Sequence, residues 1–112
     1  MDDCLSEAEW KYLSQHLQPL ALDRFCRRVL AEVAQVATDD AKGSHERYRA
    51  VFQLIEERDR ELAAAFDGLR RSTAFWQLIR MRSLGLITDE ELAGFSPETQ
   101  DAIRALMTSR NR

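Results

Sequence analysis

The chain has 112 residues, of which 45% are hydrophobic and 31% are charged, proportions that are typical of one ordinary globular domain. Its formal net charge of −3 excludes a general electrostatic attraction to nucleic acid or to an anionic membrane surface. Only four glycines and two prolines are present, which favours long helices joined by short connections.

The N-terminal third predicts two helices separated by a proline. Ser6 and Glu9 have the spacing of a capping box, in which each side chain accepts a hydrogen bond from a free backbone amide of the first turn. A first helix is expected from there to Pro19, because proline lacks the amide hydrogen and usually ends a helix. A second helix is expected over residues 20–37, followed by a polar connection over residues 38–43.

The longest periodic segment runs from Ser44 to Leu69. Apolar residues recur along it in alternating steps of four and three, which predicts a long amphipathic helix. This stripe consists of Tyr48, Phe52, Ile55, Asp59, Leu62, Phe66 and Leu69. At about 1.5 Å per residue the helix would span roughly 40 Å. The other helices, or a second copy of the chain, are therefore expected to pack along it.

Shorter helices are predicted after the long one. Residues 73–84 are apolar around most of the helical circumference, which is typical of a helix buried between neighbours or at an interface. Gly85 suits the left-handed position that ends a helix. Thr88 and Glu91 form a second capping box before a short helix. Pro97 suits the first position of a final helix.

These elements predict one all-α domain that covers residues 1–112. The expected architecture is a compact bundle of five or six helices around the long central helix at about 44–69. The tail over residues 108–112 is expected to fray.

The stretch LIRMRSLGLITDEEL resembles the short C-terminal helical hairpin called SHOCT through the residues from Gly85 to Glu91. The resemblance consists of a C-cap glycine, a hydrophobic contact and a capping box. It covers about a seventh of the chain, which is too little to assign the family. It would imply a mediator of oligomer contacts rather than a catalytic activity.

Motifs for catalysis and metal binding are absent from the sequence. No glutamate stands three residues before His16 or His45, so the Glu-x-x-His pair of a di-metal bundle is missing. There is also no HExxH, P-loop, dinucleotide-binding or G-x-S-x-G motif. Cys4 and Cys26 lack CxxC spacing, which favours reduced thiols in a cytoplasmic protein. We expect no enzymatic activity, no cofactor, no metal and, without a long apolar run, no membrane partner.

Two charged residues occupy positions that suit apolar ones. Asp59 lies on the centre line of the long stripe, and Arg82 lies near the centre line of the helix at 73–84. An isolated buried charge is costly, whereas a paired one can be tolerated. One hypothesis is that Asp59 and Arg82 form an ion pair, inside the bundle or across a dimer interface. The alternative is that Asp59 marks the place where the long helix leaves the core.

Protein–protein contact is the function that these features favour. A monomer of this length would struggle to cover both the long helix and the apolar helix at 73–84, which predicts a symmetric homodimer. Phe75, Trp76 and Met81 are the candidate interface residues, because aromatic residues and methionine are enriched in such patches. Their alternative place is the core of a monomer.

The alternative function is that of a nucleic-acid-binding regulatory protein. Arginines near Phe75 and Trp76 could hold phosphates while the aromatic rings stack on bases. The candidate contacts are Arg70, Arg71 and Arg80, together with Arg24, Arg27 and Arg28 of the second helix. Acidic residues on both sides of this cluster argue against that function, because they can pair with the same arginines.

Overall fold

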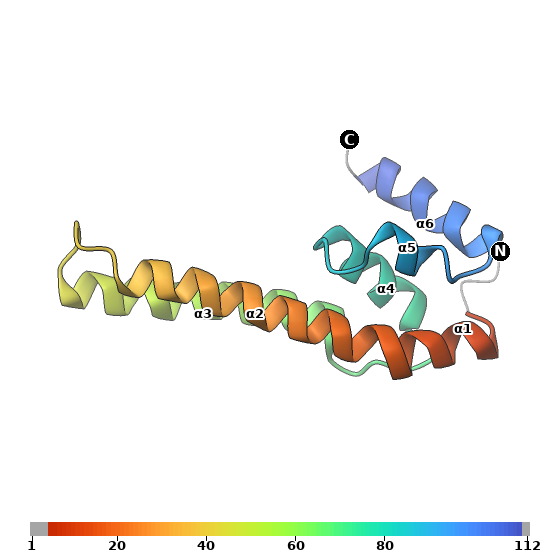
Figure 1. The fold of residues 1–112 in the computed structure, drawn as a ribbon, viewed down its shortest axis with the longest axis horizontal. Helices are drawn as coiled ribbons and strands as arrows, with labels where there is room; N and C mark the ends of the chain where they lie inside the picture. Colours follow the sequence, from red (N-terminus) through yellow and green to blue (C-terminus); the bar gives the residue numbers. More distant parts are fainter. Residues whose placement is uncertain (1–4, 111–112) are drawn as a thin grey trace.

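One helical run extends from Glu7 to Ala37. The structure, a computed structural model, describes residues 5–110, with side chains described as far as Thr108. In it, α1 (Glu7–Tyr12), the π-helical turn η1 (Leu13–Leu17) and α2 (Gln18–Ala37) follow one another without a break (Figure 1). The capping box predicted at Ser6 and Glu9 is confirmed, since each side chain accepts a hydrogen bond from the other residue's amide.

Pro19 lies inside this continuous run, so the prediction that it ends the first helix is wrong. The turn before it is wider than an α-helical turn, because the Gln18 N–H bonds to the Leu13 carbonyl five residues earlier. In a regular α-helix the proline ring would meet the carbonyl four residues before it, and the wider turn relieves this clash. Leu13 and Leu17, at the two ends of this turn, are both buried in the core.

The chain reverses over residues 38–43, and α3 (Ser44–Phe66) returns beside α2. After it come α4 (Ala74–Ser83), α5 (Asp89–Leu92) and α6 (Pro97–Arg110). Residues 5–110 contain helices and turns but no strand, which confirms the predicted all-α class. α6 continues to Arg110, so residues 108–110 are helical where fraying was expected, and residues 111–112 lie outside the described part.

The molecule has two parts, which we call the arm (residues 26–64) and the head (residues 5–25 and 65–110). Figure 1 shows α2 and α3 extending side by side as the arm, while α4, α5 and α6 gather with α1 at one end. The buried apolar side chains come from the head, and no residue from 26 to 64 is buried. α4 contributes most, with six of its ten residues buried. The apolar helix predicted at 73–84 is therefore buried between neighbours.

The arm makes the molecule longer than the compact bundle that was expected around residues 44–69. Its radius of gyration is 16.7 Å and its extents are 53 × 31 × 23 Å, whereas a compact domain of this length has a radius of about 13 Å. Within α3, only Ala65 and Phe66 at its C-terminal end are buried. The reason is that the chain after α3 packs into the head and does not return along the arm. The rest of α3 therefore has α2 as its neighbour.

Gln77 joins α4 to the end of α3. Its side chain is buried, and its Nε2 donates to the carbonyl of Asp67 at 3.0 Å and to that of Ala65 at 3.4 Å. The last carbonyls of a helix have no partner within the helix, so a buried donor that reaches them stabilises the helix end. Gln77 thereby fixes the position at which the arm enters the head.

Gly94 lies against the ring of Tyr12 and has no room for a side chain. A Cβ at this position would stand 2.7 Å from Tyr12 Cε2 and 2.9 Å from Cζ. The Tyr12 hydroxyl also donates to the Glu91 carbonyl at 2.9 Å, which ties α1 to α5.

The substitution Gly94→Ala should lower the free energy of unfolding by about 1–3 kcal/mol, because the added methyl displaces the Tyr12 ring. Urea denaturation followed by circular dichroism would measure the change. In a Tyr12→Ala background the same substitution should cost less than about 0.5 kcal/mol. An equal cost in both backgrounds would show that the clash with Tyr12 is not the cause.

Candidate protein-interaction surface

The arm exposes large apolar side chains along one face. On α3, Tyr48, Phe52 and Ile55 are 69%, 57% and 49% exposed, and Leu30 on α2 is 68% exposed. A shallow groove of about 320 Å³ lies between α2 and α3 beside Leu30 and Ile55. It is lined by Phe25, Cys26, Val29, Leu30, Val33, Ile55, Arg58, Asp59 and Leu62. We call Cys26, Leu30, Val33, Tyr48, Phe52 and Ile55 the arm face.

The arm face contains half of the stripe that was predicted to be covered, because α2 packs on another side of α3. Val51 and Leu54 are half-buried, and Val51 lines a hollow together with Ala37 of α2. On that side Arg58 also bridges the two helices, with its Nε 3.1 Å from Glu32 Oε1 and its Nη1 2.6 Å from Glu61 Oε1. The side chains that contact α2 therefore turn Tyr48, Phe52 and Ile55 outward.

The electrostatics of this bridge favour the charged forms of its members. Hydrogen bonding to Arg58 is the main cause that lowers the pKa of Glu32 below its ordinary value. The same hydrogen bond to Glu32 is the main cause that raises the pKa of Arg58. The bridge is about one-third exposed, so its contribution to stability is modest, and its main effect is to fix the register of α2 on α3.

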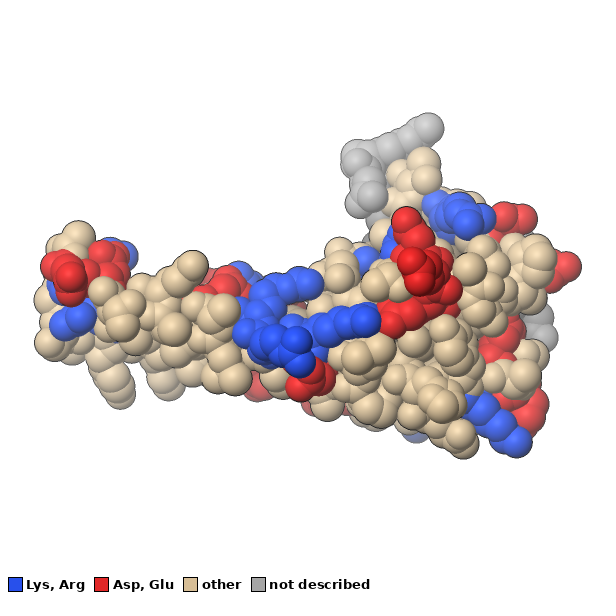
Figure 2. All heavy atoms as spheres, in the orientation of Figure 1, with Lys and Arg blue, Asp and Glu red and all other residues tan. Residues whose placement is uncertain are grey.

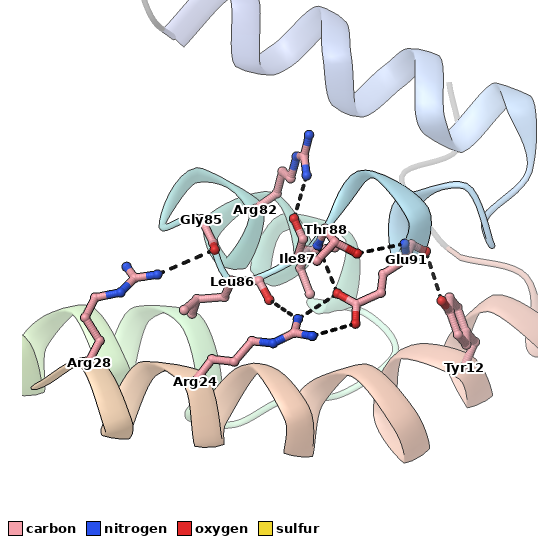
Figure 3. Close-up of polar contacts among 9 residues, drawn as sticks. All are labelled: Tyr12, Arg24, Arg28, Arg82, Gly85, Leu86, Ile87, Thr88 and Glu91. Carbon is pink, nitrogen blue, oxygen red and sulfur yellow. Dashed lines mark hydrogen bonds and ion pairs between the residues drawn. The ribbon is translucent and has the colours of Figure 1, made fainter. Parts of the chain in front are cut away.

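Asp59 and Arg82, the candidates for a buried ion pair, do not meet within the chain. Arg82 pairs with Asp89 and also donates to the Ile87 carbonyl (Figure 3). Asp59 is exposed and borders the groove of the arm. The buried residues of α3 are Ala65 and Phe66, so Asp59 lies before the part of the helix that enters the core. The alternative expectation, that Asp59 marks where the helix leaves the core, agrees with this arrangement.

Of the three candidate interface residues, only Trp76 is exposed. Phe75 and Met81 are buried in the core of the head, so a partner could not reach them without unfolding α4. Trp76 is 46% exposed and packs edge-on against Phe75, with 5.4 Å between ring centroids. The sequence could not separate these positions, because a helix that is apolar on several sides gives no preferred outer face.

Most of the arginines predicted to contact nucleic acid are engaged within the protein. Arg24 forms two hydrogen bonds of 2.7 and 2.9 Å with the carboxylate of Glu91. The remaining engaged pairs are Arg27 with Asp23, Arg71 with Glu7, and Arg28 with the carbonyls of Leu84 and Gly85. Arg70 and Arg80 are exposed, and their side chains have no hydrogen-bond or ion-pair partner among the described residues.

Arg24 and Arg28 attach α2 to the rest of the head. Both extend from α2 to the segment that links α4 to α5, where Arg24 also donates to the Leu86 carbonyl at 2.8 Å (Figure 3). The predicted capping box of Thr88 and Glu91 is confirmed, and Arg24 binds the same carboxylate. Hydrogen bonding to Arg24 is the main cause that lowers the pKa of Glu91. Sequence reasoning missed this contact, because the two residues are 67 positions apart.

Charged side chains of both signs lie together at the junction of the arm and the head. Figure 2 shows basic side chains gathered where the arm meets the head, with acidic side chains beside them. On the same view, much of the arm between its tip and the junction carries uncharged side chains. The basic residues at the junction thus lie beside acidic residues.

The described part of the chain, residues 5–110, holds little that metal binding or membrane insertion would require. No three side chains among histidine, cysteine, aspartate and glutamate gather there as metal ligands. Cys26 is a free, exposed cysteine on the arm face, and Cys4 lies outside the described residues. None of the helices that the structure describes combines the length and the apolar character needed to cross a membrane. Comparison of the chain with protein-family models, curated proteins and solved structures finds no match.

Proposed function

We propose that this protein acts by binding another protein through the arm face and that it catalyses no reaction. The observation that carries the proposal is the exposure of Leu30, Tyr48, Phe52 and Ile55 together on one face. Side chains of this size expose on the order of 100 Å² each at these fractions, so the four alone form a patch of about 400 Å². Contiguous apolar patches of this size commonly mark interaction sites.

The geometry of the arm face favours a helical partner. Tyr48, Phe52 and Ile55 follow one another in steps of four and three, the spacing at which one helix contacts another along its length. The groove between α2 and α3 offers a seat for such a helix. Aromatic side chains at the centre of an interface contribute most to binding when water is excluded from them. Phe52 occupies that position here.

The proposed setting is the cytoplasm, and the proposed role is that of a small adaptor or self-associating protein. Cys26 is a free thiol on the arm face, and the reducing cytoplasm keeps such a thiol from forming unwanted disulfides. Binding of nucleic acid has less support, because four of its six candidate arginines are hydrogen-bonded within the protein.

The double variant Tyr48→Ser/Phe52→Ser should lose its protein partner and remain folded. Both side chains are exposed, so the free energy of unfolding should change by less than about 1 kcal/mol. The measurement is quantitative affinity purification of the tagged chain from its own host, together with sedimentation of the pure protein. The matched control is Trp76→Ala, which removes an exposed aromatic ring from the head and should retain the partner. Equal partner recovery by the double variant and the wild type would exclude the arm face.

A further inference from the structure

We propose that the partner seated on the arm face is a second copy of this chain, with the two α3 helices packed antiparallel. The inference rests on the proposed function, since it names the partner of the same surface. In the proposed complex, Phe52 packs against Ile55 of the partner subunit, and Tyr48 packs against Asp59 of the partner subunit.

The exposed residues of α3 have the spacing of a helix that packs against a second helix. Tyr48, Phe52, Ile55 and Asp59 occupy successive core positions of a heptad, with Phe52 and Asp59 at position a and Tyr48 and Ile55 at position d. Such a 3.5-residue period keeps a helix in contact with a partner that carries the same period. We call these four positions the seam. α2 does not cover the seam, since Tyr48, Phe52 and Ile55 stay exposed beside it. The seam is therefore free for another helix, and α3 itself has the matching period.

Asp59, the acidic residue in the seam, favours antiparallel over parallel packing of the two α3 helices. In a parallel pair, identical positions face each other, so Asp59 would lie against Asp59 of the partner subunit and the two charges would repel. In an antiparallel pair, an a position faces a d position. The register that places Phe52 on Ile55 of the partner subunit also places Asp59 on Tyr48 of the partner subunit. Each carboxylate then faces a phenolic hydroxyl that can donate a hydrogen bond to it.

Charges on the edge of the seam support the same direction. Arg49 and Glu56 are exposed and line a surface hollow with Tyr48 and Phe52, on the side away from α2. Both residues occupy position e of the heptad, and in an antiparallel pair position e of one helix faces position e of the other. Arg49 then faces Glu56 of the partner subunit, and the two-fold axis repeats this pair. The chain is thus complementary to itself in the antiparallel arrangement.

The available area fits a dimer of ordinary size. The four most exposed apolar side chains supply about 400 Å² per subunit, and a standard interface buries roughly 800 Å² per partner. The half-buried and polar residues that flank them, Val33, Leu62, Arg49 and Glu56, lie where they can supply the remainder. Two arms packed in this way form a four-helix bundle, which covers the surface that a single arm leaves exposed.

Charge reversal of the edge pair tests both the partner and the direction. Arg49→Glu places glutamate against Glu56 of the partner subunit twice, and Glu56→Arg places arginine against Arg49 of the partner subunit twice. Each variant alone should dissociate, with Kd raised roughly tenfold or more at low salt, because like charges oppose each other. An equimolar mixture of the two variants should form a heterodimer, because every facing pair is again of opposite sign.

Sedimentation equilibrium and native mass spectrometry of the full chain would measure these states, and circular dichroism would confirm that each variant is folded. Arg60→Glu, another charge reversal on α3 but away from the seam, is the control and should leave the dimer unchanged. A wild-type dimer whose two single variants fail to assemble when mixed overturns the antiparallel register.

A monomeric wild-type chain overturns pairing with a second copy. If the wild type is monomeric but binds host partners that the Tyr48→Ser/Phe52→Ser variant loses, the arm face remains the interface. Only the identity of the partner is then wrong. If the double variant keeps the same partners, the proposed function fails as well.

Discussion

Replacing Arg24 with alanine should lower the free energy of unfolding by about 2–3 kcal/mol, because Glu91 then loses its partner on α2. The side chains of Arg24 and Glu91 are 31% and 17% exposed. Loss of one partner leaves the other charge partly desolvated, which costs more than the net value of the pair. The substitution also removes the hydrogen bond from Arg24 to the Leu86 carbonyl. Urea denaturation at neutral pH would measure the change.

Arg27, about one turn after Arg24 in the same helix, provides a matched control. It pairs with Asp23 at 2.6 Å, but its side chain is 79% exposed and the pair lies within one helix. Such a surface pair contributes little, so Arg27→Ala should cost less than about 0.5 kcal/mol. If both substitutions cost the same, the attachment of α2 to α5 does not depend on Arg24.

The same pair predicts how stability responds to acid. Hydrogen bonding to Arg24 lowers the pKa of Glu91 in the folded protein, so the contribution of the pair is present above the ordinary glutamate pKa of about 4.3. It is lost as the pH falls through the lowered pKa, where the carboxylate becomes protonated. The stability difference between the wild type and Arg24→Ala should therefore shrink as the pH falls below about 4.3. A difference that stays constant as the pH falls well below about 4.3 would contradict this role for the pair.

Leu78→Ala should destabilise the protein by about 2–5 kcal/mol, because Leu78 is fully buried in the core of the head. α4 is surrounded by neighbours, so a cavity there can collapse only in part. Thermal and urea denaturation would measure the loss. Leu20→Ala is the matched control, since Leu20 is 41% exposed and its truncation should cost less than about 1 kcal/mol. A small loss at Leu78 would mean that the core does not lie around α4.

Local features of the fold could be predicted because their chemistry lies within a few neighbouring residues. The capping boxes at Ser6 and Thr88 each depend on a partner three residues away, and both are present. Gly85 has the expected positive φ of 75° after α4, where a side chain would be strained. Pro97 begins α6 as its fixed φ suggests.

The candidate site could be predicted only in part, because periodicity shows which face of a helix needs a neighbour but not which neighbour covers it. The stripe of the long helix has the same spacing whether it contacts a core or another chain. Its half at Phe66 is buried in the head, and its half at Phe52 is exposed. Pro19 was misjudged for a related reason, since whether proline breaks a helix depends on how the preceding turn adapts. Contacts such as Arg24 with Glu91 depend on the tertiary fold and leave no local pattern.

The separation between arm and head has a consequence for the order in which the chain folds. The ion pair between Glu32 and Arg58 closes 26 residues, whereas the hydrogen bonds that join α1 to the C-terminal half of the head close 79 and 87 residues. Short loops close at a lower entropic cost, so we expect the contacts between α2 and α3 to form before those that join α1 to the C-terminal half of the head. Under the proposed pairing, two chains translated side by side would join through their arms before either had completed its head.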